Sequence, residues 1–222
     1  MRFRVLLLTI SVVTAGTAQA KMIAADSSAD WVAATVDNGV PNQGELNWFY
    51  GYYATDGAPA TFAQLPLWAT AYGWWGISGS TVNNPIVGQT VMHPGWDGPL
   101  ANRWAVRRWM SEVTGSATIA GTVQDGDLGG GDGIALRFYV NDVELSAQAI
   151  GLTGFDGSVH SFSFTAPLVA GQPLDFAIDD KGNPFWDSTQ FSVTVATPEP
   201  TAFALLGGAL LALRHRRRSR GR

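Results

Sequence analysis

Residues 117–142, with the sequence ATIAGTVQDGDLGGGDGIALRFYVND, decide the fold class. From Ala117 to Val123 small or apolar residues occupy every second position, and the same pattern returns from Ile134 to Val140. A period of two is typical of a strand that buries one face. Residues 125–133 between these runs contain only glycine and aspartate around a single leucine, which is typical of a turn. The stretch therefore predicts two β-strands joined by a glycine-rich loop.

The same alternation recurs downstream, at residues 162–164, 175–179 and 190–195, with turn-forming clusters between the runs. Residues 21–197 contain no sustained apolar pattern with a period of 3.6. Short strands separated by such turns predict an all-β protein with a single jelly-roll-like β-sandwich over residues 21–196. The aromatic-rich residues 46–53 and 68–75 are expected to add edge strands and loops to it.

The composition excludes several classes of site. The chain of 222 residues has no cysteine, so it forms no disulfide, thiolate zinc site or cysteine nucleophile. Its 26 glycines exceed the usual share of roughly 7%, as expected for a protein with many turns.

The first 20 residues form a predicted signal peptide outside the fold. Arg2 and Arg4 precede an apolar run from Val5 to Val13, and Ala18-Gln19-Ala20 is a small-residue cleavage pattern. The alternative is an N-terminal membrane anchor, but the run is short for a hydrocarbon core of ~30 Å. We therefore expect the signal helix to direct export, with cleavage before Lys21.

Residues 197–222 show the reverse order at the other end. Pro198, Glu199 and Pro200 precede the uncharged residues 201–213, which as a helix would cover only about 20 Å. This marginal membrane segment and the arginine cluster after it comprise Ala202, Phe203, Leu205, Leu206, Leu210, Leu211 and Leu213, followed by Arg214, Arg216, Arg217, Arg218, Arg220 and Arg222. The arginines would stay cytoplasmic under the positive-inside rule, which leaves residues 21–196 on the far side.

These three ordered parts resemble the PEP-CTERM sorting signal of Gram-negative bacteria. The resemblance implies that an exosortase, a membrane protease-transpeptidase, processes the tail near Pro198-Glu199-Pro200 after export. It also implies an inner-membrane intermediate and a mature protein at the cell surface or in the extracellular matrix, often beside exopolysaccharide. The alternative for residues 197–222 is an ordinary tail anchor.

The part between the two ends is strongly acidic. Residues 1–20 carry +2 and residues 199–222 carry +5, so the net charge of −4 leaves −11 for residues 21–198. Such a field repels phosphate backbones and anionic lipids, which argues against nucleic-acid binding. Divalent cations and uncharged sugars fit this charge better.

Short motifs within residues 92–196 carry a second, weaker resemblance. They resemble a β-sandwich domain of exported bacterial proteins, similar to jelly-roll carbohydrate-binding modules, which supports the fold and assigns no ligand. The motifs are Trp109–Gly115, Ala117–Gly121, Gly130–Ile134, Phe138–Asn141, Leu174–Phe176 and Asp187–Thr189.

Asp125, Asp127 and Asp132 are candidate calcium ligands, because hard carboxylate oxygens suit Ca²⁺. The alternative is a solvated turn, in which Asp and Gly are common anyway. A second candidate group comprises Asp179, Asp180 and Asp187. Apart from this structural calcium, no cofactor is expected.

Trp74, Trp75, Trp96 and Trp186 are candidate glycan-stacking residues, because a flat ring presents apolar area to a sugar face. Nine tryptophans exceed what one core requires. The alternative for each ring is packing in the core.

No catalytic residue is predicted. His93 and His160 are far apart in the sequence and have no ligand-like spacing, and no nucleophile elbow is present. Arg103, Arg107 and Arg108 lie in an alternating run, and we expect them to pair with acids on the surface.

The sequence thus predicts a non-catalytic exported protein that associates with exopolysaccharide, after handling by the export machinery and an exosortase. One alternative is a purely structural matrix protein without a specific ligand. The other is a glycoside hydrolase, which would need two carboxyl groups facing each other across a cleft.

Overall fold

The computed structural model describes residues 21–31, 36–37, 40–41, 43–69, 73–76, 85–96 and 102–198. The predicted signal peptide and residues 199–222 of the predicted tail lie outside this part, so the model says nothing about them. Met22–Thr197 form one compact unit. Within the described ranges, no helix is both long and apolar enough to span a bilayer.

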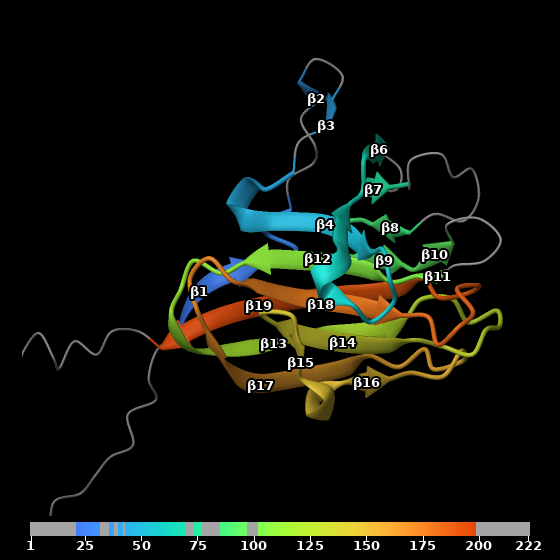
Figure 1. The fold of residues 1–222 in the computed structure, drawn as a ribbon. Coiled ribbons are helices and arrows are strands. Elements are labelled where there is room, and N and C mark those ends of the chain that lie inside the picture. Colours follow the sequence, from blue (N-terminus) through green and yellow to red (C-terminus); the bar gives the residue numbers. More distant parts are fainter. Residues whose placement is uncertain are drawn as a thin grey trace, which may run out of the picture. The chain divides into compact units, whose positions relative to one another are not determined.

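Two antiparallel sheets stack as layers (Figure 1). The first, sheet I, has the order β17-β13-β19-β9-β8-β7-β6, and β1 also pairs with β19. Its strands are β1 (Lys21–Asp26), β6 (Leu67–Ala69), β7 (Gly73–Trp75), β8 (Ile86–Val87), β9 (Val91–His93), β13 (Gly115–Asp125), β17 (His160–Leu168) and β19 (Thr189–Pro198).

The second sheet, sheet II, has the order β15-β14-β18-β12-β4-β5, and β16 also pairs with β14. Its strands are β4 (Trp48–Tyr53), β5 (Phe62–Gln64), β12 (Ala105–Met110), β14 (Ala135–Val140), β15 (Val143–Glu144), β16 (Ile150–Gly151) and β18 (Pro173–Asp179). Smaller elements are the pairs β2 (Val36–Asp37) with β3 (Val40–Pro41) and β10 (Gly95–Trp96) with β11 (Asn102–Arg103), and the 3₁₀ turns η1 (Glu45–Asn47), η2 (Pro59–Thr61) and η4 (Ser146–Gln148).

The predicted all-β sandwich is confirmed. The long strands of the second half alternate between the layers, because β12, β14 and β18 lie in sheet II while β13, β17 and β19 lie in sheet I. The first half adds β4 and β5 to one edge of sheet II and β6 to β9 to one edge of sheet I, as expected. The aromatic stretch 68–75 folds back on itself, so that Trp68 of β6 pairs with Trp74 of β7.

The core lies between the sheets and follows the predicted alternation. On β13, Ala117, Ile119 and Val123 are fully buried, while Thr118 and Thr122 on the other face are not. Phe176 of β18 and Phe191 of β19 meet across the layers with ring centroids 5.5 Å apart. Burying such a side chain contributes about 1.5–3 kcal/mol, so the paired inward faces stabilise the sandwich.

The expectation that Arg107 pairs with an acid on the surface is wrong. Its side chain is fully buried between the layers, where Nη1 donates to the carbonyl oxygen of Ser27 at 2.9 Å and Nη2 to those of Gly88 and Gln89. Its guanidinium also lies 5.8 Å from the ring centroid of Phe191. Burial lowers the pKa of Arg107 to about 10. Arg107 therefore joins β12 of sheet II to turns beside sheet I.

Arg108 does pair with an acid, but in the interior. Its Nε and Nη2 each donate to one carboxylate oxygen of Asp175 at 2.7 Å, and Asp175 is only 1% exposed. The hydroxyl of Tyr53 also donates to Asp175, at 2.8 Å. Both faces of β18 are thus covered, because these groups bury its polar side.

Candidate binding site at one end of the sandwich

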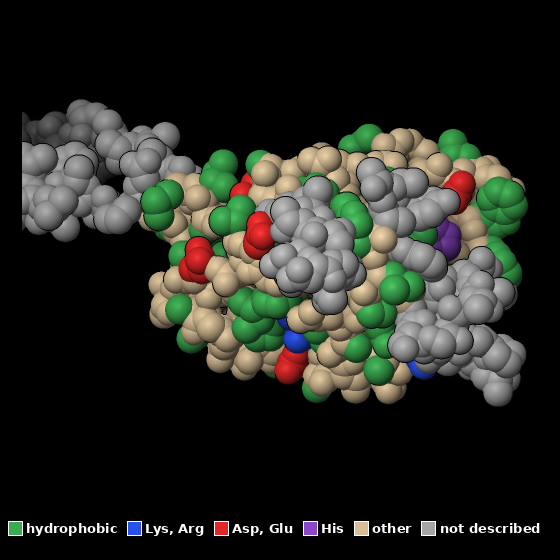
Figure 2. Space-filling model, turned by 90° about the horizontal axis from the view of Figure 1, so that it is seen from above, with side chains coloured by type: hydrophobic (Ala, Val, Ile, Leu, Met, Phe, Trp, Pro, Cys, Tyr) green, Lys and Arg blue, Asp and Glu red, His purple; other side chains and the backbone are tan. Residues whose placement is uncertain are grey.

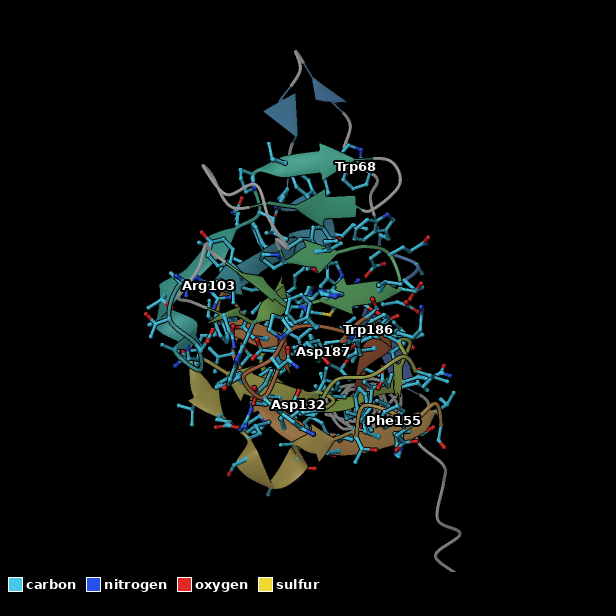
Figure 3. All side chains as sticks on the ribbon, turned by 90° about the vertical axis from the view of Figure 1, so that its right-hand side faces the viewer. Trp68, Arg103, Asp132, Phe155, Trp186 and Asp187 are labelled. Carbon is cyan, nitrogen blue, oxygen red and sulfur yellow. The ribbon has the colours of Figure 1, made fainter. Side chains whose placement is uncertain are left out.

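Three loops meet at one end of the sandwich, which we call the loop end. They are residues 126–134 between β13 and β14, residues 152–159 between β16 and β17, and residues 180–188 between β18 and β19. The strand registers bring them together, since Asp125 pairs with Thr189 and Val123 with His160. Figure 3 looks onto this end and labels Asp132, Phe155, Trp186 and Asp187 within it.

Direct contacts hold the three loops to one another. Lys181 Nζ donates to the carbonyl oxygen of Leu152 at 2.7 Å, and Gln124 Nε2 donates to that of Gly157 at 2.8 Å. A Cβ on Gly133 would lie only 2.1 Å from the carbonyl oxygen of Leu152, and Gly133 has a φ of +80°. Glycine is therefore needed there both for the left-handed backbone and for the close approach of the second loop.

Trp186 is the most distinctive residue of the loop end. Its side chain is 52% exposed, and its backbone has a φ of +67°, a conformation that disfavours side chains larger than glycine. The indole lies against two glycines, because a Cβ on Gly129 would come within 2.7 Å of Cζ3 and one on Gly130 within 3.3 Å of Cδ1. The glycine-rich loop thus supports the ring.

Other apolar side chains of the same three loops are exposed. Leu128 is 55% exposed, Phe155 71% and Phe185 43%. We call these three residues and Trp186 the aromatic patch. It contains side chains from all three loops, so only the folded loop end assembles it.

The four predicted stacking residues differ in how the structure places them. Trp74 is only 1% exposed, and its ring stacks on Tyr50 with centroids 6.3 Å apart and an interplanar angle of 17°. Trp74 therefore belongs to the core, and the prediction that it contacts a glycan is wrong. Trp186 has the exposure that stacking requires. The side chains of Trp75 and Trp96 lie outside the described residues.

Buried carboxylates lie beneath this surface. Asp187 is fully buried, Asp180 is 1% exposed and Asp125 is 2% exposed. Oδ2 of Asp125, Oδ2 of Asp180 and both carboxylate oxygens of Asp187 are buried without a hydrogen-bond partner. Oδ1 of Asp187 is directed at loop 126–134, since a Cβ on Gly131 would lie 3.5 Å from it. We call Asp125, Asp132, Asp180 and Asp187 the acidic cluster.

The other three carboxyl groups of the acidic cluster act on Asp187. Burial raises the pKa of Asp187 to about 8, and repulsion by Asp132, Asp180 and Asp125 adds to this rise. Burial also raises the pKa of Asp180, helped by Asp179 and Asp132. Desolvation of the charged form is the leading cause at both carboxyl groups.

The acidic cluster draws on both groups of aspartates that the sequence offered as metal ligands. Asp125 and Asp132 come from the first group, and Asp180 and Asp187 from the second. Asp127 instead contacts Asp125 through its backbone NH, at 3.0 Å, and its charge acts on His93. Across the described residues, no three acidic, His or Cys side chains are arranged as a set of metal ligands. The predicted triad of Asp125, Asp127 and Asp132 is therefore not assembled.

His160 has a partner that the sequence analysis missed. Its Nε2 lies 2.8 Å from Oδ2 of Asp156, four residues earlier. The i, i+4 spacing gave no signal because residues 156–160 belong to a turn and the start of a strand rather than to a helix.

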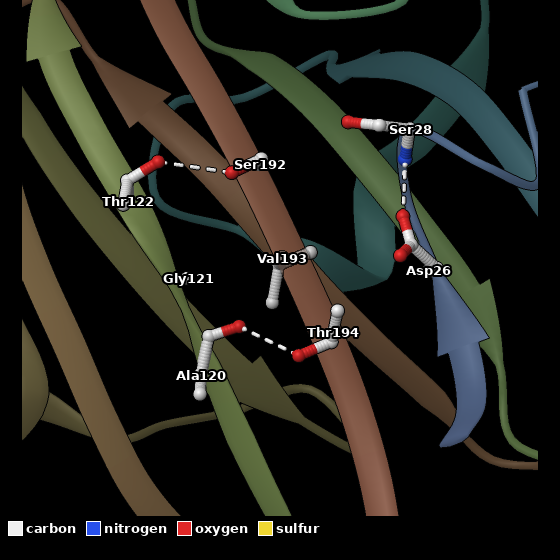
Figure 4. Close-up of a pocket in the computed structure, with 8 residues that line it drawn as sticks. All are labelled: Asp26, Ser28, Ala120, Gly121, Thr122, Ser192, Val193 and Thr194. Carbon is white, nitrogen blue, oxygen red and sulfur yellow. Dashed lines mark hydrogen bonds between the residues drawn. The ribbon is translucent and has the colours of Figure 1, made fainter.

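A shallow groove lies on the outer face of sheet I, away from the residues that the sequence predicted for a site (Figure 4). Its volume is about 430 Å³. Thr122 Oγ1 and Ser192 Oγ are hydrogen-bonded at 2.9 Å on its floor, and Asp26 Oδ1 accepts from the Ser28 NH at 2.9 Å at its rim. The other residues that line it are Ala120, Gly121, Val193 and Thr194, so no aromatic ring is available for stacking.

The described residues carry few basic groups. Figure 2 shows acidic side chains at several separate places on one face and few Lys or Arg side chains. Two of the basic residues, Arg107 and Arg108, are used inside the fold. The charge arrangement therefore gives no basic patch for a polyanion on the face shown.

No model of a known protein family matches the sequence, and no curated protein matches it. Among solved structures, the chain is similar to a family 35 carbohydrate-binding module from Clostridium thermocellum, with 12% identity and a TM-score of 0.29, over 54% of this chain and 85% of that one. It is also similar to an exo-β-1,3-galactanase from Phanerochaete chrysosporium (10% identity, TM-score 0.30, 67% of this chain and 27% of that one). A β-glucosidase from Kluyveromyces marxianus shows 12% identity and a TM-score of 0.31, over 81% of this chain and 19% of that one. At these TM-scores the resemblance is weak and carries no argument about the site.

Proposed function

We propose that this protein is a non-catalytic carbohydrate-binding β-sandwich of the bacterial cell surface or extracellular matrix. Its ligand is an uncharged glycan such as exopolysaccharide, and its contact surface is the aromatic patch. Export through the signal peptide and processing of the tail by an exosortase belong to the same proposal and rest on the sequence of residues 1–20 and 197–222.

The conformation of Trp186 carries the proposal. A left-handed backbone at a non-glycine residue costs on the order of 1–3 kcal/mol and is retained where the surrounding structure or a function requires it. Here the cost is not offset by burial, because half of the side chain remains exposed. The ring is flat, supported from below by Gly129 and Gly130, and open to a ligand. This arrangement suits stacking on the apolar face of a sugar.

Charge and composition favour an uncharged ligand. The net charge of −11 over residues 21–198 repels anionic polymers, whereas a neutral glycan meets no such barrier. Phe155 and Phe185 extend the apolar surface beyond a single ring. A glycan chain bridging these side chains would bury more area than one sugar on Trp186 alone.

The test is retardation of the purified protein in native gels that contain host exopolysaccharide, xylan or a neutral β-1,3-glucan. We expect at least one of them to retard the wild-type protein. Trp186→Ala should weaken the affinity by roughly 30-fold, because a central aromatic contact contributes about 2 kcal/mol. Trp186→Phe, which keeps a ring, should retain part of the binding.

Val143→Ala is the matched control, because Val143 is 65% exposed and lies beyond β14 at the opposite end of that strand. It should bind like the wild type. Unchanged mobility of the wild-type protein in every glycan would instead support a purely structural matrix protein.

A further inference from the structure

The acidic cluster holds more buried carboxyl oxygens than the surrounding groups satisfy with hydrogen bonds. Three of its carboxylates are at most 2% exposed, and four of their oxygens accept no hydrogen bond. A buried charged group is costly unless it is paired or binds a metal ion. Buried oxygens that lack a donor therefore indicate that a cation belongs there.

Other buried acids of this fold show what compensation looks like. Asp175 accepts two hydrogen bonds from Arg108 and one from Tyr53, all between 2.7 and 2.8 Å. Asp179, next to the cluster in sequence, accepts from Arg137 Nε at 2.7 Å. Among the described residues, a guanidinium thus donates to each of these two carboxylates and none donates to Asp187.

The nearest lysine does not fill this role. This lysine, Lys181, belongs to loop 180–188 itself. Its Nζ is bonded to the carbonyl oxygens of Leu152, at 2.7 Å, and Asp132, at 3.4 Å. In the described part of the chain it forms no ion pair with a carboxylate. These bonds instead show that the main-chain carbonyls of Leu152 and Asp132 point toward loop 180–188.

We infer that the acidic cluster is a calcium site between loops 126–134 and 180–188, with Asp187 as its central ligand. Ca²⁺ takes six to eight oxygen ligands, among which backbone carbonyls and waters are common. The side chains here are not arranged as three direct ligands of one ion. One or two carboxylates, with Asp180 and Asp125 as the candidates beside Asp187, would therefore share the ion with carbonyl and water oxygens. The remaining acids contribute charge at longer range.

This ligand chemistry selects among metals. The cluster offers only oxygen, which excludes a site built for zinc or copper by nitrogen and sulfur ligands. Mg²⁺ demands near-ideal octahedral geometry at short distances, whereas Ca²⁺ accepts irregular sets of ligands. An irregular, loop-built site therefore favours Ca²⁺.

The site would tie together two loops of the loop end. Asp187 follows Trp186 directly, and its carboxylate is directed at Gly131, two residues after Gly129 and its contact with the indole. Bound Ca²⁺ would therefore fix the loops that support the ring. The inference rests on the buried, unpartnered oxygens of the acidic cluster and does not depend on glycan binding.

The test measures Ca²⁺ alone, without any glycan. The full-length protein is treated with a chelator, exchanged into metal-free buffer, and titrated with CaCl₂ by calorimetry and by thermal unfolding. We expect saturable binding of one ion per chain and a rise in Tm of about 5–10 °C at a free concentration 100-fold above Kd. MgCl₂ at the same concentration should raise Tm by less than half as much.

Asp187→Asn separates loss of the site from loss of the fold. The variant should lose the calcium-induced rise in Tm, while its metal-free Tm equals or exceeds that of the wild type, because a buried charge has been removed. Asp127→Asn, in the neighbouring loop 126–134, is the control and should keep the full response.

Three results would overturn the inference. They are the absence of both heat and a rise in Tm in the metal-free wild type, an unchanged calcium response in Asp187→Asn, and an equal response to Mg²⁺.

Discussion

Asp175 shows how single residues hold the interior of this protein together. Its carboxylate is buried on the outer side of sheet II, where Arg108 and Tyr53 donate to it. The Arg108 guanidinium also lies 4.1 Å from the ring centroid of Phe62, on a strand at the edge of the same sheet. Removing one partner of such a pair leaves the other charge buried and unpaired.

We therefore expect Asp175→Asn to lower the free energy of unfolding by about 3 kcal/mol, as measured by urea denaturation. Asp142→Asn is the control, because Asp142 also faces Arg108, at 3.6 Å, but is 45% exposed. It should change the stability by less than about 0.5 kcal/mol. Equal effects of the two substitutions would show that the bidentate pair adds nothing to stability.

His93 gives the protein a defined response to acid. Burial lowers its pKa below the ordinary 6.5, although the contact with the Pro94 carbonyl and the charge of Asp127 oppose this. Above pH 6.5 the imidazole is neutral in both states and has no effect. Below that value the unfolded chain takes up a proton first, so stability falls until the pH reaches the lowered pKa of the folded state.

His93→Gln should therefore lose less stability than the wild type between pH 7 and pH 5. The measurement is the free energy of unfolding at several pH values, with the wild-type curve subtracted from that of the variant. This difference removes the contribution of the buried aspartates, whose raised pKa values act in the opposite direction. A pH-independent difference would contradict the burial of a neutral imidazole.

At the scale of elements, the sequence predicted which residues form strands and face the core, but not which residues cover the other face of each strand. Alternation on β13 and β18 correctly indicated which residues face the core, because the period of two is a local property. It could not indicate that the polar side of β18 is also covered. That cover depends on Arg108 and Tyr53, which are 67 and 122 residues away in sequence.

Gly121 tests the pairing of β13 with β19. A Cβ at this position would lie 2.0 Å from the carbonyl oxygen of Ser192 on β19 and 2.7 Å from Cζ of Phe162 on β17. Gly121→Ala should therefore push the strands apart and destabilise the protein by about 1–3 kcal/mol, measured by thermal or urea unfolding.

Gly151→Ala provides the comparison for this prediction. Gly151 lies on β16, and nothing would come within 4 Å of a Cβ placed there. Its effect should stay within about 0.5 kcal/mol. A similar loss in both variants would point to backbone entropy rather than to the close approach at Gly121.

At the scale of the whole molecule, the fold joins residues that the sequence keeps apart. The two predicted aspartate groups are far apart in sequence, with 47 positions from Asp132 to Asp179, yet the pairing of Asp125 with Thr189 brings them to one end. Spacing in the sequence could identify the acids but not this pairing of strands. The prediction therefore grouped Asp127 with Asp125 and Asp132, and it placed Asp187 in a second group with Asp179 and Asp180. Burial could likewise not be read from the tryptophans, because nothing in the sequence around Trp74 and Trp186 distinguishes a core ring from an exposed one.

The last prediction concerns the whole chain in its host. The export and sorting that we propose rest on the contrast between the basic ends and the acidic body, because basic flanks beside apolar segments are typical of export and membrane-insertion signals. Intact mass spectrometry of the protein from host cells should therefore show a chain that begins at Lys21 and has lost the arginine cluster near Pro198–Pro200. Replacing Pro198 and Pro200 by alanine should leave the tail attached. A full-length, 222-residue mass in the soluble fraction would contradict both the export and the sorting that we propose.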